Sequence, residues 1–201
     1  AYVTYDDFGA RCDGKYDDFI AIRNAHTFAN SNNCEVRGTT GKTYHIFKFY
    51  DDVANINTNV DWNDSTFIIH DEEIEEVSGR FSNLFKVNNI TETITINHPS
   101  WTIGTETKQI AGLSEKLKTL NSKGYTKYLC IARNSTKKQY IRYGIDSSGY
   151  NQQDYFLIDS ECNVLNDIQW DFEKLTSITV EAIPNSKIDI KNGTFISNAL
   201  N

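Results

Sequence analysis

The chain has 201 residues and a formal net charge of −7, with acidic and basic residues mixed along its length. This length allows one large domain, or one domain with an insertion, around a sizeable hydrophobic core. The acidic balance argues against nucleic acid and anionic membranes as partners, because both are bound through clustered lysine and arginine. No apolar run approaches the length of a membrane span, and no signal-peptide pattern opens the chain, so a signal peptide is absent or already removed.

The first 46 residues predict a short strand, a glycine-containing turn, a helix and a second strand. The helix is expected over residues 17–30, because apolar side chains recur there at steps of three and four. Asp17 and Asp18 are placed to cap its N-terminus. The second strand follows, with Tyr44 and Ile46 expected to point inward. The apolar stripe of the helix consists of Phe19, Ile22, Ala25, His26 and Ala29.

Four runs in this region resemble the N-terminal cap of the pectin-lyase-like superfamily of right-handed parallel β-helices: Val3–Ala10, Asp13–Asp18, Phe19–Ala25 and Gly41–Ile46. Pectate lyases, polygalacturonases and phage tail-spike depolymerases belong to that superfamily. The resemblance implies a mainly β fold, the N-terminal portion of a right-handed single-stranded parallel β-helix with a capping α-helix. The helix would cover the open edge of the first coil, which otherwise invites pairing with other chains. One departure is Cys12, where the family usually has a glycine or another small residue.

Short strands and one later coil continue the expected β-helix. The run from Asp61 to Ile69 resembles a pattern that follows the cap in the family, a polar turn before a strand such as Phe67–Ile69. A further coil is expected at 187–196, with Ile188, Ile190 and Phe195 pointing inward. Because so few coils would leave the far end uncovered, the sequence is interpreted as an N-terminal fragment of a longer protein. The short strands are expected at 53–56, 60–62, 66–70, 83–87 and 92–96.

Residues 98–172 carry a different pattern. A helix is predicted at 107–122, ending near Gly124, and two hairpins are predicted with turns at 134–138 and 160–162. We interpret this segment as a small α+β domain inserted between coils, which divides the chain into 1–97, 98–172 and 173–201. The buried stripe of the helix is expected to be Ile110, Leu113, Leu117 and Leu120.

No motif identifies a catalytic pair, a metal site or a cofactor. The run Gly38–Thr43 lacks the first glycine of a phosphate-binding loop, because position 36 is valine. The run Asp159–Asn163 lacks the glycine of a calcium loop and is expected to be a hairpin turn. Residues 71–76 are interpreted as a solvated acidic loop, with a cation site as the alternative.

Neither the histidines nor the cysteines have the spacing of a metal site. His26 is expected to pack within the cap helix, and the other histidines, His45, His70 and His98, are given no functional role. Reduced thiols are favoured for Cys12, Cys34, Cys130 and Cys162, and a Cys12–Cys34 bridge is the alternative.

Aromatic residues of the insertion are the candidate glycan-binding residues, because flat rings stack on the C–H faces of sugars. The alternative is that they form the core of the small domain. Residues three apart on a strand face opposite sides, so Tyr140 and Tyr143 are not expected to share one surface. The candidates are Tyr140, Tyr143, Tyr150, Tyr155 and Trp170.

The resemblance implies the N-terminal part of a polysaccharide-directed protein, most closely a phage tail-spike or receptor-binding depolymerase in the virion. It would act on or bind bacterial surface or plant-type glycans, as a homotrimer, with any catalytic residues on coils beyond this chain. One alternative is a non-catalytic trimeric tail or adhesin stalk. Another is a secreted, extracellular pectate-lyase-like enzyme or glycoside hydrolase. Whether the full-length protein is catalytic is left open, and this part alone is not expected to be an enzyme.

Overall fold

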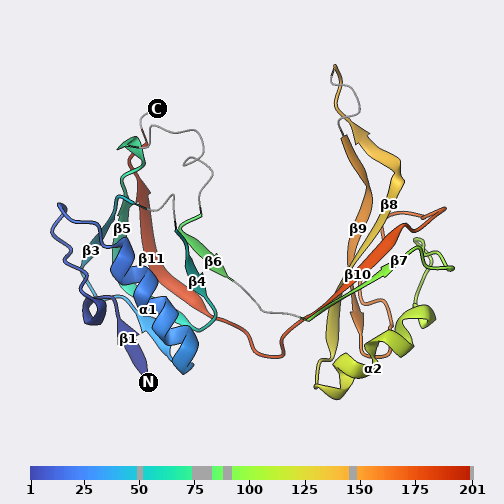
Figure 1. The fold of residues 1–201 in the computed structure, drawn as a ribbon, viewed down its shortest axis with the longest axis horizontal. Helices are drawn as coiled ribbons and strands as arrows, with labels where there is room; N and C mark the ends of the chain where they lie inside the picture. The colour runs from blue at the N-terminus through green and yellow to red at the C-terminus, as the bar shows by residue number, and fades with distance from the viewer. Residues whose placement is uncertain (49–51, 74–82, 88–91, 145–148, 200–201) are drawn as a thin grey trace. The chain divides into compact units, whose positions relative to one another are not determined.

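The computed structural model describes residues 1–48, 52–73, 83–87, 92–144 and 149–199. The chain is mainly β and divides into two compact units (Figure 1). Unit 1 comprises residues 1–88 and 187–201, and unit 2 comprises residues 89–186. Unit 2 is therefore inserted within the chain of unit 1, and each unit has its own hydrophobic core.

Parallel strand pairs build unit 1 wherever it is described. Strand β5 (Val60–Ile69) pairs with β2 (Glu35–Arg37), β3 (Thr43–Ile46) and β11 (Ile190–Ser197), and β2 also pairs with β1 (Tyr2–Thr4). A separate pair joins β4 (Ala54–Ile56) to β6 (Phe85–Val87). The described part of unit 1 also contains two short 3-10 helices, η1 (Asp6–Phe8) and η2 (Asp71–Glu73).

Helix α1 (Phe19–Asn32) packs against β1, β2 and β4 through the predicted apolar stripe. All five stripe residues are buried, so the sequence-based helix and its buried face are confirmed. Tyr44 and Ile46 on β3 are also buried, as predicted. The helix ends at Asn33, whose φ of 49° is a left-handed conformation that asparagine tolerates.

The two aspartates before α1 have different roles. Asp17 caps the helix as predicted, because its Oδ1 accepts the N–H of Phe19 at 3.2 Å. Asp18 makes no side-chain bond to the helix. Its carboxylate instead accepts the backbone N–H groups of Arg11, Cys12 and His45 at 2.7, 3.2 and 2.9 Å. Asp18 is only 1 % exposed, and a buried carboxylate requires such partners.

Residues 60–70, expected as two strands, form the single strand β5. Asn63 and Asp64 take φ values of 50° and 58°, which bends the strand without ending it. Residues 93–97 do not join the parallel strands. They form β7 (Thr93–Asn97), which pairs antiparallel with β10 (Ser177–Ala182) in unit 2. The unit boundaries, at 88/89 and 186/187, therefore differ from the expected 97/98 and 172/173.

Unit 2 is a four-stranded antiparallel sheet in the order β7-β10-β8-β9. The 3-10 helix η4 (Ala111–Leu113) and helix α2 (Ser114–Ser122) replace the longer predicted helix. Gly124, at a φ of 91°, follows the helix as predicted. Within the described residues, no helix is long and apolar enough to cross a membrane. All four residues of the apolar stripe predicted for this helical segment are buried: Ile110, Leu113, Leu117 and Leu120.

The first predicted hairpin of unit 2 is wrong, and the second turn is confirmed. Residues 127–141 form one strand, β8 (Lys127–Ile141), which pairs with β9 (Gly149–Asp159). Register shifts between Asn134 and Tyr140 accommodate the polar run that resembles a turn. Asp159 closes the other turn by accepting the N–H groups of Glu161 and Asn163, each at 2.9 Å.

Candidate functional site

The five candidate aromatic residues lie on the surface of unit 2. Because none belongs to the hydrophobic core, the alternative that they form that core is wrong. The core is built instead by smaller apolar side chains together with Tyr128, Phe156 and Phe172. The exposed fractions are 54 % for Tyr140, 104 % for Tyr143, 60 % for Tyr150, 51 % for Tyr155 and 42 % for Trp170.

Tyr140 and Tyr150 form a stacked pair across the β8–β9 hairpin. They are register partners, with ring centroids 6.2 Å apart and ring planes at 22°. Gly149 permits this arrangement, because a Cβ at that position would lie 2.1 Å from the carbonyl oxygen of Tyr140. Tyr143 follows the end of β8 and is fully exposed.

Tyr155 lies on the opposite side of β9 from Tyr150. Side chains alternate along a strand, and the buried residues of β9 are Gln152, Asp154, Phe156 and Ile158. Tyr150 shares their side of the sheet, whereas Tyr155 faces away from the core. On its own side Tyr155 lies beside Ile131 of β8.

Trp170 lies in the segment between β9 and β10. The residues two positions before and after it, Ile168 and Phe172, have side chains buried in the core. The five aromatics therefore do not form one surface. Tyr140 and Tyr150 have their rings stacked on each other, and among the described residues they are the strongest candidate for a flat stacking surface.

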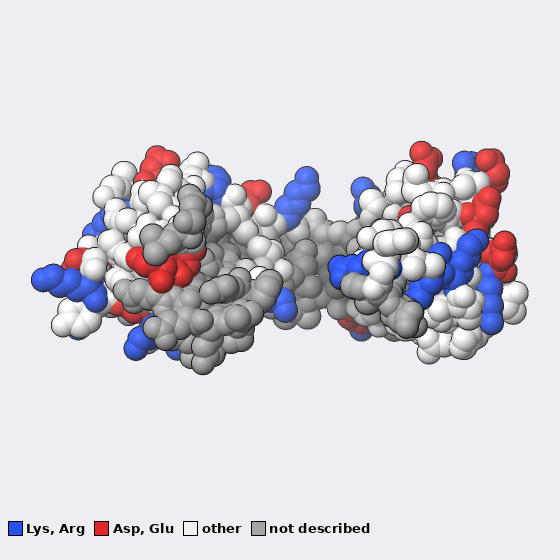
Figure 2. Space-filling view, turned by 90° about the horizontal axis from the view of Figure 1, so that it is seen from above, with Lys and Arg blue, Asp and Glu red and all other residues white. Residues whose placement is uncertain are grey.

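Basic side chains lie on the same half of the hairpin as the tyrosine pair, and one of them, Lys137, has Oε1 of Glu173 4.0 Å from its Nζ. Lys137, Lys138 and Arg142 are exposed on the same half of the hairpin. The acidic residues of the described part of β8 and β9 are Asp154, which is 7 % exposed, and Asp159 in the far turn. Figure 2 shows basic side chains on the displayed face of unit 2, with acidic side chains beside them. This half of the hairpin therefore combines flat rings with positive charge.

The structure also joins two histidines to which the sequence gave no role. Nδ1 of His45 lies 2.9 Å from Nε2 of His70, and Nδ1 of His70 lies 3.1 Å from Oε1 of Glu72. The ring of Phe47 stacks on His70 at 3.9 Å between centroids. His45 is the register partner of Ile68, and His70 follows the end of β5, where its N–H donates to the carbonyl oxygen of Ile46 at 2.9 Å. The sequence carried no signal for this contact, because it depends on the pairing of β3 with β5.

This histidine pair does not complete a metal site. Among the described residues, no group of three His, Cys, Asp or Glu side chains has metal-binding geometry. Asp71, at the start of the expected acidic loop, accepts a hydrogen bond from Ser197 at 2.5 Å, and residues 74–76 lie outside the described part of the chain. Gly41 takes the φ of 75° that its turn requires, and strand β3 follows it, where the second strand of the cap was predicted.

The cysteines do not provide a reactive nucleophile. All four are free, so the Cys12–Cys34 bridge does not form. Burial raises the pKa of the Cys12 thiol to about 11, which keeps it protonated at neutral pH. Burial also raises the pKa values of Cys130 and Cys162.

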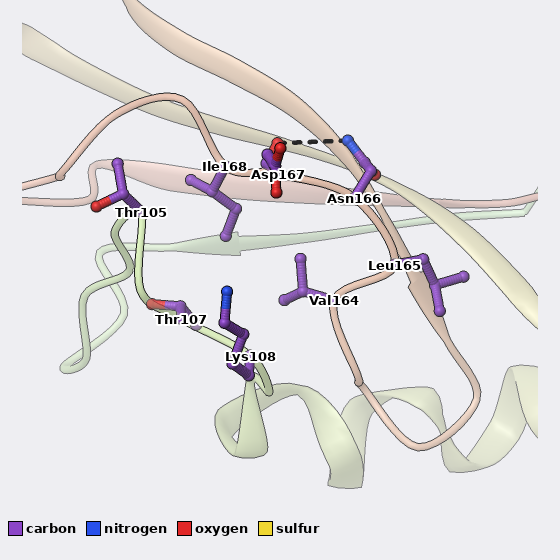
Figure 3. A pocket seen from close by; sticks show the side chains of 8 residues that line it. All are labelled: Thr105, Thr107, Lys108, Val164, Leu165, Asn166, Asp167 and Ile168. Carbon is purple, nitrogen blue, oxygen red and sulfur yellow. Dashed lines mark hydrogen bonds between the residues drawn. The ribbon is translucent and has the colours of Figure 1, made fainter.

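The described surface includes a hollow in each unit. The first, of about 100 Å³, lies in unit 2 between residues 105–108 and 164–168 (Figure 3). It is below the size usual for a small-molecule site. The second, of about 590 Å³, lies in unit 1 beside the start of α1.

No family model matches the chain, and a search of curated proteins finds no match. The fold is similar to that of the tailspike gp61 of Pseudomonas phage phi297, with a TM-score of 0.54 and 11 % sequence identity. The similarity covers 96 % of this chain and 34 % of the tailspike, so the chain spans about a third of that protein's length. At this identity the similarity concerns the fold, which is therefore tailspike-like.

Proposed function

We propose that this chain is the N-terminal part of a phage tail-spike protein that is directed at bacterial surface polysaccharides. The observation that carries the proposal is the tailspike-like fold, because the similarity extends over 96 % of the chain. In this proposal the protein belongs to the virion and is a homotrimer, and any catalytic residues lie on coils beyond residue 201.

The arrangement of unit 1 supports a right-handed parallel β-helix as its architecture. Tyr44, Phe67 and Phe195 are register partners on β3, β5 and β11. Their ring centroids are 5.2 and 4.9 Å apart, close to the spacing of paired strands, so the rings form a continuous stack. Such a stack is what successive coils of a solenoid produce when equivalent residues face the same side, and Phe195, at the end of this stack, is 41 % exposed rather than buried as predicted.

The tyrosine pair of unit 2 supports a direct role in glycan binding. Two stacked, exposed rings present a flat apolar surface to the C–H face of a sugar. Their cost of ordering is low, because each ring is held by its neighbour and by the hairpin backbone. Unit 1 would organise the solenoid, and the hairpin of unit 2 would contact the polysaccharide.

A binding panel tests this function. The purified chain is presented with bacterial capsular and lipopolysaccharide glycans, and the same mixtures are assayed for reducing ends and unsaturated products. We expect binding to at least one glycan, without cleavage by this part alone. A chain that binds none of the panel would overturn the proposal, and glycan release by this chain would overturn the placement of catalysis on later coils.

A further inference from the structure

The four-stranded sheet of unit 2 ends in two edge strands, β7 and β9 (Figure 1). Strand β7 pairs on one side with β10, and among the described residues nothing pairs with its other side. The free side of an edge strand presents backbone N–H and C=O groups to any extended chain that approaches it. The state of these two edges therefore decides where unit 2 can add a strand.

Alternate residues of β7 direct their backbone groups away from β10. The N–H of His98 donates to the carbonyl oxygen of Thr176 at 2.9 Å, so position 98 faces β10. Because this direction alternates along an antiparallel strand, the odd-numbered positions of β7 face outward. Within the described part of the chain, no hydrogen bond reaches these outward N–H and C=O groups. The outward residues are Thr93, Thr95 and Asn97.

The other edge, at β9, is partly closed by contacts within unit 2. The N–H of Leu157 donates to Oδ1 of Asn166 at 2.6 Å, and the N–H of Asp159 donates to the carbonyl oxygen of Asn163 at 3.1 Å. Proteins also protect edges with lysine, proline or a bulge, and Thr93–Asn97 contains none of these. The edge that is open along its whole length is therefore β7.

The sequence of β7 is complementary to itself. Ile94 and Ile96 pack against the core of unit 2, and three polar residues alternate with them on the other face. A second β7 that runs antiparallel, with Thr95 opposite Thr95, places Ile94 of each copy opposite Ile96 of the other. The isoleucines then pair on the core side of both sheets. The outward residues also face one another, so each of the three facing pairs can form two backbone hydrogen bonds.

The two neighbouring registers lose contacts. A shift of the centre by one residue towards the C-terminus would place Pro99, which lacks an N–H, opposite Thr93. A shift in the other direction would place Ile96 opposite the carboxylate of Glu92. The register centred on Thr95 avoids both problems and uses every outward backbone group of β7.

We propose that unit 2 associates with a second copy of this chain through antiparallel pairing of their β7 edges. The two sheets become one eight-stranded sheet with a two-fold axis at Thr95. The inference goes beyond the proposed function and does not rest on glycan binding. A three-fold axis cannot generate this contact, so it is separate from the proposed homotrimer and would join two such trimers into a hexamer.

The register supplies a matched pair of variants. Thr93 of one copy faces Asn97 of the other, so T93K/N97K places like charges opposite each other, whereas T93K/N97E places opposite charges there. T95P removes one outward N–H without removing a bond to β10, and T95V keeps that N–H. All three positions are exposed, so the fold is expected to tolerate these substitutions, which circular dichroism and thermal unfolding check.

The test is sedimentation equilibrium of the whole chain over a range of concentrations. We expect the wild type, T95V and T93K/N97E to contain an even number of chains, and T95P and T93K/N97K to have half that mass. A wild type that stays monomeric would overturn the inference and leave the edge to a different partner. Equal masses for T93K/N97K and T93K/N97E would also overturn it.

The same variants separate this inference from the proposed function. A trimer whose mass none of the substitutions changes would overturn the β7 pairing and leave the proposed function standing. Glycan binding that survives in T93K/N97K, together with its halved mass, would support both. Pairing that follows the variants as expected, without binding to any glycan of the panel, would remove the function alone.

Discussion

The phenol of Tyr5 and the imidazole of His26 form a buried hydrogen bond, 3.0 Å from Oη to Nε2. Trp62 donates its Nε1–H to the same phenol oxygen at 2.9 Å. The phenol oxygen accepts from Trp62, and the direction of its bond with Nε2 of His26 depends on the imidazole tautomer. Three elements of unit 1, the segment after β1, helix α1 and strand β5, are joined at this point.

The burial of His26 predicts that the stability of the protein depends on pH. Burial lowers the pKa of His26 to about 4, below its unfolded value near 6.5. Between these two values the unfolded chain binds a proton that the folded chain excludes, so stability is fully present above about pH 6.5 and falls as the pH is lowered towards 4. The loss is at most roughly 3 kcal/mol.

Urea unfolding at pH 7 and pH 4.5 measures this effect. His26→Gln keeps an acceptor for Tyr5 but does not titrate, so the variant should be less stable at pH 7 and should lose less stability on acidification. If the wild type and H26Q lose equal stability between the two pH values, His26 is not the cause.

Asp18 is predicted to be essential for the attachment of the cap. Asp18→Ala leaves three backbone N–H groups without their acceptor and should lower the free energy of unfolding by roughly 3 kcal/mol. Asp13→Ala, at an exposed turn, is the matched control and should cost less than about 1 kcal/mol. Thermal or urea unfolding gives both values, and equal costs would contradict the role assigned to Asp18.

Gly149→Ala is predicted to change the geometry of the β8–β9 hairpin while it changes the stability of unit 2 only slightly. The new methyl group would lie 2.1 Å from the carbonyl oxygen of Tyr140, so the end of the hairpin must shift and the tyrosine pair must separate. The core around Phe156 is untouched, so a small change in melting temperature should accompany a loss of polysaccharide binding. Retained binding would indicate that the pair is not needed.

His45 and His70 are predicted to contribute to stability as a unit. His45→Ala, His70→Ala and the double variant form a cycle whose coupling free energy should be about 1 kcal/mol, because the two side chains hydrogen-bond and stack. His98→Ala, at an exposed position, should show no coupling to either. If the effects of the two single substitutions on the free energy of unfolding simply add in the double variant, the contact between the histidines does not contribute to stability.

Local periodicity predicted the parts of the fold that depend on neighbours in sequence. The buried face of α1 and the inward residues Tyr44 and Ile46 follow from spacings of three or four and of two. For Phe195 the sequence predicted only an inward direction of the side chain. Its stacking on Phe67 was not predicted, because the two residues are 128 positions apart and meet through strand register.

The features that the sequence predicted wrongly or missed have one physical cause. Each depends on a partner that lies far away in the sequence. The acceptor role of Asp18 depends on His45, which is 27 residues away, so a capping pattern alone cannot reveal it. Residues 134–138 have the composition of a turn, but the partner strand β9 converts them into an irregular part of β8. The contact of His45 with His70 requires the register of β3 and β5, which the sequence alone does not fix.

Equilibrium binding of a polysaccharide from the panel to Y140A/Y150A, with Y155A as the control, tests the central claim most directly. Tyr155 is about as exposed as the pair but lies on the opposite side of β9, so its loss should leave binding unchanged. The account predicts that the double variant weakens binding by about 2 kcal/mol or more, from two lost stacking contacts. Wild-type affinity in Y140A/Y150A would contradict it.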